Sequence, residues 1–378
     1  MAIPGEMRIC LVSSAYRPYI SGVGEHVHYL GTHLQKMGHS VHILTSTYQT
    51  ISEPELLPAT RLGKGLVLPF ARGEFTLPVG LRLAQQVKNF FQTSKFDIVH
   101  CHGIFPPELA YWAARYSASP IIVTFHSVTP DLPEVCTSLF SVFFRNLNNK
   151  LCSKIAVSFA VRNWAEKFFP GAYEIIPSGV DLKRFHPAVK PALAVTSVPR
   201  LLYVGRLEKR KGLEYLIRAL PAVRKKFPGT QLIVVGYGPL KKFFERLAGK
   251  LNLKDAVQFI GAVSNSNLAG FYTSSTIYIA PTTGREALGI VLIEAMACGV
   301  PVIASDTSGY NEVIKNNENG ILVPPANVEK LQEAIISLLS SHQLRKKLIE
   351  NGLLSSRSYD WVKIATQIEI IYKRSYNE

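Results

Sequence analysis

The sequence has little of several features that define whole protein classes. Its 378 residues include five cysteines and no Cys-x-x-Cys pair, so neither a disulfide scaffold nor a zinc ribbon is expected. A reducing cytoplasm is the simpler setting. Acidic residues are also scarce, with 27 Asp and Glu against 42 Lys and Arg, a formal net charge of +15. This excess favours anionic partners without distinguishing nucleotides, lipid head groups and nucleic acid.

Long apolar segments are missing as well. The longest, residues 287–304, is interrupted by Glu294, Gly299 and Pro301, so a transmembrane helix is not expected. The apolar run before Ser13 and Ser14 is too short for the hydrophobic region of a secretory signal. We therefore expect a cytoplasmic protein that contacts a membrane, if at all, from one side.

Short β-branched runs alternate with helix-length segments along the chain, for example at 96–102, 120–126, 200–207 and 231–236. This alternation predicts parallel sheets covered by helices on both faces. The length suggests two domains, and a stretch of prolines and small residues at 186–200 reads as a linker. We predict domains at 1–185 and 186–358, with a terminal helical segment at 359–378. Ligands of such sheets bind beyond the carboxyl ends of the strands.

The most informative motif lies at residues 284–305. Gly289 is expected to open a helix whose first turn, Gly289, Ile290 and Val291, offers free N–H groups to phosphate oxygens. Glu286 would project from the preceding loop. Glu294 would lie about one turn into the helix, where a carboxylate can accept hydrogen bonds from two hydroxyls. The alternative is a loop acid and an ion-paired glutamate, but a carboxylate in an apolar helix favours function because a buried charge needs a partner.

Two further motifs follow strands of the second half. Arg206 and Lys211 lie five residues apart after the run at 200–207, and together they offer a forked donor and a point charge to an anion. The alternative is that they are solvated members of a basic run. Gly236 and Gly238 allow a tight turn after the run at 231–236.

Three motifs of the first half are weaker. Ser21 and Gly22 begin a glycine-containing loop before a helix, but Val27 stands at the last position of the dinucleotide pattern, so a dinucleotide site is not predicted. His126 ends the strand at 120–126. It is either a functional residue at the strand end or a structural histidine with satisfied hydrogen bonds. His100 and His102 share one strand face, but no third ligand at suitable spacing is evident, so no metal site is predicted.

The segment Glu-x-Leu-Gly-x-x-x-x-Glu-Ala-Met-Ala-x-Gly-x-Pro-Val-Ile-Ala-Ser resembles the signature of the retaining glycosyltransferases of family 4, which have the GT-B fold. The similarity extends over roughly residues 7–376, and the phosphatidylinositol mannosyltransferases look most similar. Further segments carry it: YVGRLEKRKG at 203–212, VVGYGP at 234–239, IIPSGVD at 175–181, SGVGEHV at 21–27, DIVHCH at 97–102 and TFHS at 124–127.

The resemblance implies two Rossmann-like, doubly wound domains facing each other across a cleft, with the C-terminal helix packing back on the N-terminal domain. The N-terminal domain would bind the acceptor and the C-terminal domain a nucleotide sugar. Residues implied to be catalytic are His126, Glu286, Arg206 and Lys211. Those implied to bind the donor are Gly22, Arg206, Lys211, Gly236, Gly238, Glu286, Leu288, Gly289, Ile290, Val291 and Glu294. Those implied on the acceptor side are Ser21, Gly22 and His126.

The implied reaction transfers a hexose with retention of configuration. Double displacement needs a carboxylate nucleophile, and the resemblance supplies no agreed one, so we favour front-face substitution in which the leaving phosphate takes the acceptor's proton. The chain has no Asp-x-Asp pair, so metal-independent nucleotide binding is expected, with no tightly bound cofactor and with stimulation by Mg²⁺ left open. Leu288 replaces a more usual aromatic residue and Ser178 a more usual asparagine, which leaves the sugar's identity in doubt.

The acceptor and donor are less well defined. The first expectation is mannose from GDP-mannose and a phosphatidylinositol-like lipid at an anionic surface, on the inner face of the plasma membrane. Amphipathic segments at 81–93 and 132–147 suit a membrane contact, but ordinary core packing is the favoured alternative because core helices show the same pattern. Alternatives are a UDP-sugar-dependent transferase with a soluble or polysaccharide acceptor, and a nucleotide-sugar epimerase, phosphorylase or binder of the same fold. Nucleic acid is not expected, because no aromatic–basic interleaving is present.

Overall fold

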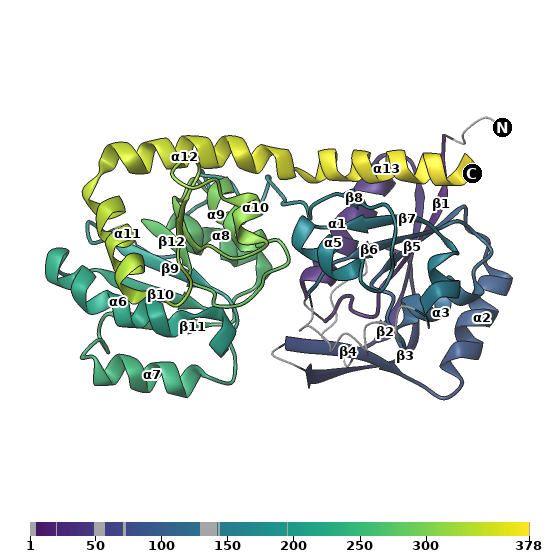
Figure 1. Ribbon diagram of the computed structural model, residues 1–378, viewed down its shortest axis with the longest axis horizontal. Coiled ribbons are helices and arrows are strands. Elements are labelled where there is room, and N and C mark those ends of the chain that lie inside the picture. Colours follow the sequence, from purple (N-terminus) through teal and green to yellow (C-terminus); the bar gives the residue numbers. More distant parts are fainter. Residues whose placement is uncertain are drawn as a thin grey trace. The chain divides into compact units, whose positions relative to one another are not determined.

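The computed structural model describes residues 5–19, 21–48, 57–70, 73–128, 142, 144–194 and 196–377. The chain divides into two compact units, residues 1–179 with 361–378 (unit 1) and residues 180–360 (unit 2). Each is described by itself (Figure 1). The observed division after Gly179 differs from the predicted one after residue 185. The N–H of Val180 donates to the Tyr359 carbonyl at 2.7 Å, which ties the first residue of unit 2 to its last turn.

Unit 1 is built on one sheet of strand order β4-β3-β2-β1-β5-β6-β7-β8, parallel except for the β3–β4 pair. The strands are β1 (Arg8–Val12), β2 (Ser40–Thr47), β3 (Ala59–Phe70), β4 (Gly73–Val79), β5 (Ile98–His102), β6 (Ile121–Phe125), β7 (Leu151–Ala156) and β8 (Glu174–Ile175). The helices are α1 (Gly22–Lys36), α2 (Leu83–Thr93), α3 (Leu109–Tyr116), α5 (Phe159–Ala165) and α13 (Trp361–Asn377).

Unit 2 carries a six-stranded parallel sheet of order β11-β10-β9-β12-β13-β14. The strands are β9 (Arg200–Val204), β10 (Gln231–Val235), β11 (Val257–Gly261), β12 (Ile277–Ala280), β13 (Val302–Ser305) and β14 (Ile321–Val323). The helices are α6 (Leu213–Lys226), α7 (Lys241–Lys250), α8 (Asn265–Thr273), α9 (Ile290–Ala297), α10 (Tyr310–Val313), α11 (Val328–Ser340) and α12 (His342–Ser356), with 3-10 turns at Lys209–Lys211 and Arg357–Tyr359. This is the Rossmann strand order.

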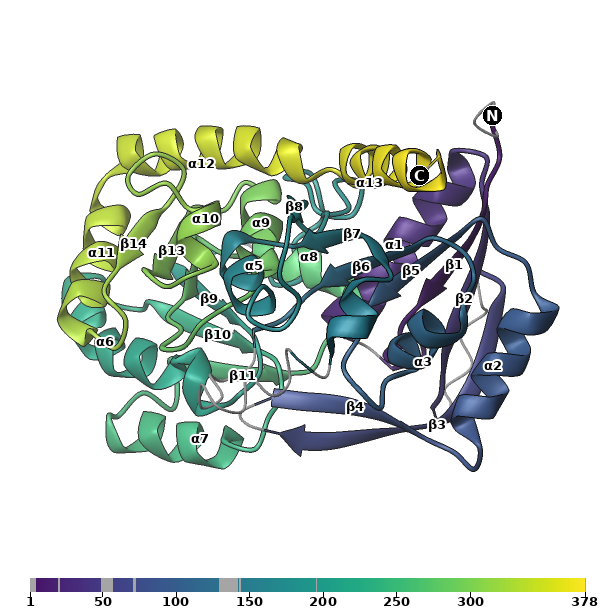
Figure 2. The same cartoon turned by 45° about the vertical axis from the view of Figure 1, so that its right-hand side comes forward.

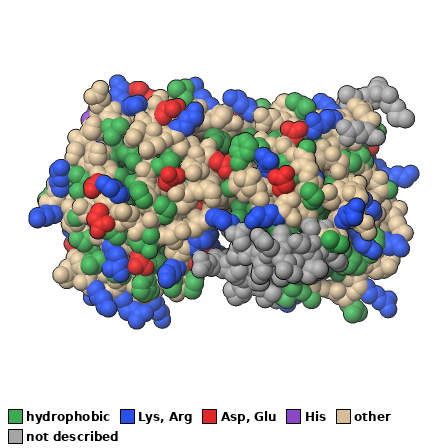
Figure 3. Space-filling model, in the orientation of Figure 1, with side chains coloured by type: hydrophobic (Ala, Val, Ile, Leu, Met, Phe, Trp, Pro, Cys, Tyr) green, Lys and Arg blue, Asp and Glu red, His purple; other side chains and the backbone are tan. Residues whose placement is uncertain are grey.

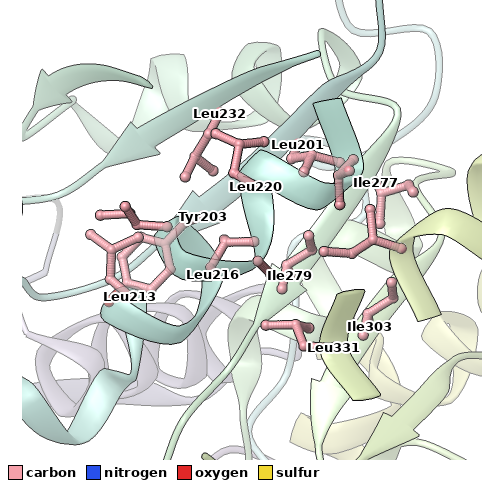
Figure 4. Packing of buried hydrophobic residues seen from close by; sticks show 14 of the residues in the cluster. Leu201, Tyr203, Leu213, Leu216, Leu220, Leu232, Ile277, Ile279, Ile303 and Leu331 are labelled. Atoms are coloured by element: carbon pink, nitrogen blue, oxygen red, sulfur yellow. The ribbon is translucent and has the colours of Figure 1, made fainter. Parts of the chain in front are cut away.

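The core of unit 2 lies between the sheet and its helices. Alternate residues of β9 and β12 are buried against α6 and α11, as the packed side chains in Figure 4 show. Among them, Leu216 and Leu220 lie one turn apart on α6, and Leu331 comes from α11. Full burial on both sides of the sheet explains why the strands read as continuous apolar runs.

The C-terminal helix α13 belongs to unit 1, where it contacts α1 (Figure 2). Its predicted apolar stripe, Trp361, Ile364, Ile368 and Tyr372, is buried in the core of that unit. Both units are Rossmann-like α/β sheets, and the terminal helix packs on the N-terminal one, so the predicted fold class is confirmed. Among the described residues, no helix combines the length and the apolar character that crossing a bilayer requires.

The two amphipathic segments differ in how far they can be assessed. In α2, Leu83 and Val87 are buried and Phe90 packs near His42 and Phe96, so core packing accounts for this stripe. Leu81, just before the helix, is 87% exposed. The segment 132–147 lies mostly outside the described residues.

The core position of α13 gives a paired prediction. Ile368 is 1% exposed and Ile370 is 59% exposed on the same helix. Ile368→Ala should lower the free energy of unfolding by about 2–5 kcal/mol because it leaves a cavity, whereas Ile370→Ala should change it by less than about 0.5 kcal/mol. All three tryptophans, Trp112, Trp164 and Trp361, are in unit 1, so urea unfolding followed by tryptophan fluorescence reports on this unit. Equal effects of the two substitutions would contradict the packing described.

Candidate functional site

The first candidate site lies where the strand order of unit 2 reverses, between β9 and β12. These strands are neighbours, while their onward connections run to opposite edges of the sheet. The loops that follow them therefore separate at their carboxyl ends, the position at which open α/β sheets bind ligands. The predicted Lys211 and Glu286 lie in these two loops.

Glu286 is the centre of a charged cluster. Its side chain is about 10% exposed, and its Oε1 accepts from Arg210 Nη1 at 2.6 Å and from Lys211 Nζ at 2.9 Å. Lys211 also reaches Oε2 at 3.0 Å, and the Thr282 hydroxyl lies 3.0 Å from Oε1. Two cations and one hydroxyl thus satisfy a nearly buried carboxylate. This arrangement removes the cost of an unpaired buried charge.

Backbone contacts hold the same two loops together. The Arg210 carbonyl accepts from the Thr283 N–H at 2.8 Å and from the Thr282 hydroxyl at 2.9 Å. Gly212 ends the 3-10 turn with φ of +71°, and a Cβ there would lie 1.8 Å from the Pro281 carbonyl oxygen. Glycine is required because no other residue permits this close approach.

Arg206 and the two glycines after β10 have partners outside this cluster. Arg206 Nε is 3.7 Å from a Glu208 carboxylate oxygen, and the guanidinium carbon lies 5.8 Å from the ring centre of Tyr237. A Cβ at Gly236 would lie 1.9 Å from the Gly205 carbonyl oxygen, so β9 and β10 end in closely apposed loops. Gly238 likewise approaches the backbone of Leu207.

The helix expected after Glu286 begins at Ile290, and Gly289 is its N-cap. Leu288 is buried, while Gly289, Ile290 and Val291 are partly exposed, which leaves the first turn open to a ligand. Glu294 lies in the second turn, 8% exposed, and the Tyr272 hydroxyl donates to its Oε2 at 2.9 Å. Burial, followed by the nearby Glu294 carboxylate, raises the pKa of Tyr272 well above its usual value, so this hydroxyl keeps its proton.

In unit 1, Ser21 is the N-cap of α1, and its hydroxyl accepts from the Gly24 N–H at 3.0 Å. Nothing lies within 4 Å of the position that a Cβ would take at Gly22. Gly22 therefore faces open space, and its backbone is accessible to a ligand. The Ser21 hydroxyl caps α1, and this hydrogen bond positions the loop.

His126 follows β6 and belongs to a cluster of rings. Its Nε2 lies 2.9 Å from His102 Nδ1, and the His26 ring on α1 packs edge-on to it with centroids 4.6 Å apart. Burial lowers the pKa of His126 to about 3 and those of His26 and His102 well below the usual value. These rings are neutral at pH 7, so His126 can act through its lone pair and ring N–H dipole rather than through a positive charge.

His100 has a structural environment. Its Nδ1 is 2.6 Å from the Tyr372 hydroxyl on α13 and its Nε2 is 2.7 Å from the Thr124 hydroxyl. Both ring nitrogens are thus satisfied within the core. Of the pair His100 and His102, only His102 joins the cluster around His126 among the described residues.

Sequence reasoning missed four side chains that the structure brings to these sites. These are Arg210, Thr282, Tyr272 and His26, to none of which the sequence analysis assigned a role. From the sequence, no third ligand at suitable spacing accompanies His100 and His102; in the structure, His26 from a helix far away in sequence lies beside His102 and His126. No spacing rule could have found it, since the contact depends on how α1 packs on the sheet.

Positive charge in unit 2 is not confined to the cluster at Glu286. Lys and Arg side chains also gather over α7, which carries Lys241, Lys242, Arg246 and Lys250 (Figure 3). The overall basic charge therefore does not by itself locate a site.

Comparisons with known proteins agree with this architecture. Residues 20–184 match the profile described as Glycosyltransferase Family 4, and residues 189–354 match Glycosyl transferases group 1. The phosphatidyl-myo-inositol mannosyltransferase of Mycobacterium leprae is 32% identical over 97% of this chain and 96% of its own.

Two solved structures share the fold. Sucrose-phosphate synthase from Thermosynechococcus elongatus superposes with a TM-score of 0.77 at 24% identity, covering 98% of this chain and 99% of its own. Anabaena HepE, solved with UDP and glucose, gives 0.76 at 20% identity, covering 96% and 98%. At these sequence identities the similarity shows a shared fold alone.

The burial of His100 predicts a pH dependence of stability. Desolvation, with a smaller effect of nearby His126, lowers its pKa from 6.5 to about 3. The unfolded chain therefore binds a proton in the window from about pH 6.5 to 3 that the folded chain does not, and stability falls as the pH is lowered through it. One such histidine contributes about 1.4 kcal/mol per pH unit.

His100→Gln should make the decline of unfolding free energy between pH 6 and pH 4 shallower by about that amount per pH unit. Urea titrations followed by tryptophan fluorescence measure it. The same substitution at exposed His342, in unit 2, is the control and should leave the slope unaltered. An unchanged slope in His100→Gln would show that this ring is not held neutral by the fold.

Proposed function

The chain belongs to glycosyltransferase family 4 and is a GT-B glycosyltransferase, and from this premise we propose that it transfers mannose from GDP-mannose to a hydroxyl of a phosphatidylinositol-like lipid. We propose further that the reaction retains the anomeric configuration and needs no metal for nucleotide binding. The alternative is a UDP-sugar donor with a soluble or polysaccharide acceptor.

The observation that carries the proposal is the cluster of Lys211, Arg210 and Glu286 at the strand reversal of unit 2. A departing nucleoside diphosphate gains negative charge as its bond to the sugar breaks. An ammonium and a guanidinium held beside it stabilise that charge. Arg206, from the same loop, and the open first turn of α9 supply further donors to the phosphates.

Glu286 then has two states in this proposal. In the structure its carboxylate is neutralised by Lys211 and Arg210 at 2.6–2.9 Å. When a diphosphate takes a share of these cations, the carboxylate oxygens become available to sugar hydroxyls. We assign Glu294, whose carboxylate accepts a hydrogen bond from Tyr272, to binding of the ribose diol. Gly236 and Gly238 are assigned to the turn that the nucleotide base approaches.

We propose front-face substitution as the chemical step. The bond from the anomeric carbon to the phosphate oxygen breaks, and the acceptor oxygen bonds to that carbon from the same side. The acceptor's proton passes to the leaving phosphate, so no enzymic nucleophile is needed. His126, in unit 1, is assigned to the acceptor side together with Ser21 and Gly22, where a neutral imidazole offers a hydrogen bond.

The choice of mannose and of an inositol lipid rests on the names of relatives that are 31–32% identical over 97% of this chain, which are phosphatidyl-myo-inositol mannosyltransferases. The structure adds one constraint on membrane contact. The stripe of Leu83 and Val87 on α2 is buried, so a bilayer would meet exposed residues instead, such as Leu81 and the neighbouring Arg82.

A donor and acceptor panel tests the proposed specificity. We expect nucleotide release from GDP-mannose to rise when phosphatidylinositol vesicles are added, with release from UDP-glucose and UDP-N-acetylglucosamine staying at background. The sugar's anomeric configuration in the product is read by NMR. Acceptor-dependent release from a UDP-sugar alone would favour the alternative, and turnover of the sugar without any acceptor would indicate an epimerase or hydrolase.

A single substitution tests the role of the charged cluster around Glu286. Glu286→Gln keeps the shape but removes the charge, and we expect kcat to fall about 10²- to 10³-fold with the thermal midpoint nearly kept. Glu318→Gln is the matched control, because Glu318 also pairs with a lysine but its side chain is 60% exposed. Its kcat should equal that of the parent. A Glu286→Gln variant with the kcat of the parent would show that Glu286 takes no part in the reaction.

A further inference from the structure

Three imidazoles converge in unit 1 from three separate elements. His26 comes from α1, His102 is the last residue of β5, and His126 follows β6. One ring nitrogen of each lies within 4.8 Å of those of the other two. Two of the side chains are almost fully buried, His26 at 2% and His102 at 4% exposure, while His126 is partly exposed. The group is thus enclosed but has an accessible side.

Two nitrogens of this group have unsatisfied hydrogen-bonding capacity. Among the described residues, His26 Nε2 and His102 Nε2 are buried and have no hydrogen-bond partner. Leaving such a buried polar atom unpaired destabilises the folded protein. Two of them in one cluster are uncommon in a folded protein, and a metal ion that accepts a lone pair would satisfy the one on His26.

The surroundings suit a metal ion that prefers nitrogen. His26 Nδ1 lies 3.1 Å from the Ser178 hydroxyl, so the ring can donate there and direct the Nε2 lone pair into the cluster. Metal-bound histidines are commonly oriented by such a second contact. No carboxylate or thiol belongs to the group as described, and a set of imidazoles favours Zn²⁺, Cu²⁺ or Ni²⁺ over Mg²⁺ or Ca²⁺.

The spacing is close to what coordination requires. Zn–N bonds of about 2.0–2.1 Å in a tetrahedron place ligand atoms about 3.3 Å apart. His102 Nδ1 and His126 Nε2 are 2.9 Å apart, and all three ligand atoms lie within 4.8 Å. Small rotations of the rings therefore suffice, and a fourth position would remain for water on the side of His126.

We propose that His26, His102 and His126 form a binding site for a divalent transition metal ion of the zinc type, with three imidazole ligands and one open position. The site rests on the geometry of unit 1 and would stand if the proposed mannosyl transfer were wrong. One consequence does depend on that function. An ion held by His126 occupies the lone pair assigned to the acceptor side, so zinc should inhibit transfer rather than support it.

The test uses the untagged, full-length chain after treatment with a chelator, in the absence of any nucleotide sugar. Titration calorimetry with zinc chloride should show one tight site, and Co²⁺ should give the strong visible absorption of a tetrahedral complex that Zn²⁺ then abolishes. His26→Gln and His102→Gln should each weaken zinc binding by at least about 100-fold, since each removes a ligand. His33→Gln, on the same helix but outside the cluster, is the matched control and should bind as the parent does.

The variants could unfold, so a second measurement uses the unaltered protein. X-ray absorption at the zinc edge counts imidazole ligands, and three support the site. No stoichiometric binding, fewer than three imidazoles, or equal affinity in parent and both folded variants would overturn the proposal. Transfer at an undiminished rate with the site filled would overturn the inhibitory consequence.

Discussion

The carboxylate of Glu286 organises the candidate site of unit 2, because a nearly buried charge must be matched by cations. Both cations, Arg210 and Lys211, come from the loop after β9, whereas Glu286 is in the loop after β12. The backbones of these loops are also joined through the Arg210 carbonyl and touch at Gly212. The two loops at the strand reversal therefore behave as one piece. An arriving diphosphate has to compete with Glu286 for the charges it binds.

Unit 1 uses the same architecture for a different electrostatic purpose. The carboxyl ends of β5 and β6 present His102 and His126, whose pKa values are lowered mainly by burial. Cations fixed in ion pairs suit a ligand that carries negative charge, while neutral rings suit hydroxyl groups or a metal ion. The fold thus provides the same kind of position twice, and side chains decide what each position can bind.

Sequence and structure agree best for features that depend on residues close together in the chain. Gly289 and Glu294 occupy the helix start and the second turn that their spacing predicted, and the stripe of Trp361 and Ile368 is buried as its period required. They disagree where contacts cross between elements. The sequence does not show that Arg210 pairs with Glu286 of the loop after β12. It also does not show that His26 of α1 lies beside His102 at the end of β5.

The sequence by itself determined the alternation of strands and helices, the two-unit organisation, the helix start at Gly289 and the amphipathic terminal helix. These follow from hydrophobic period and turn residues, which act over a few neighbours in the chain. The tertiary structure decided the partners of Glu286, the tyrosine on Glu294, the burial of the α2 stripe and the meeting of three histidines. Each joins residues far apart in sequence, and only the packing of whole elements brings such residues within bonding distance.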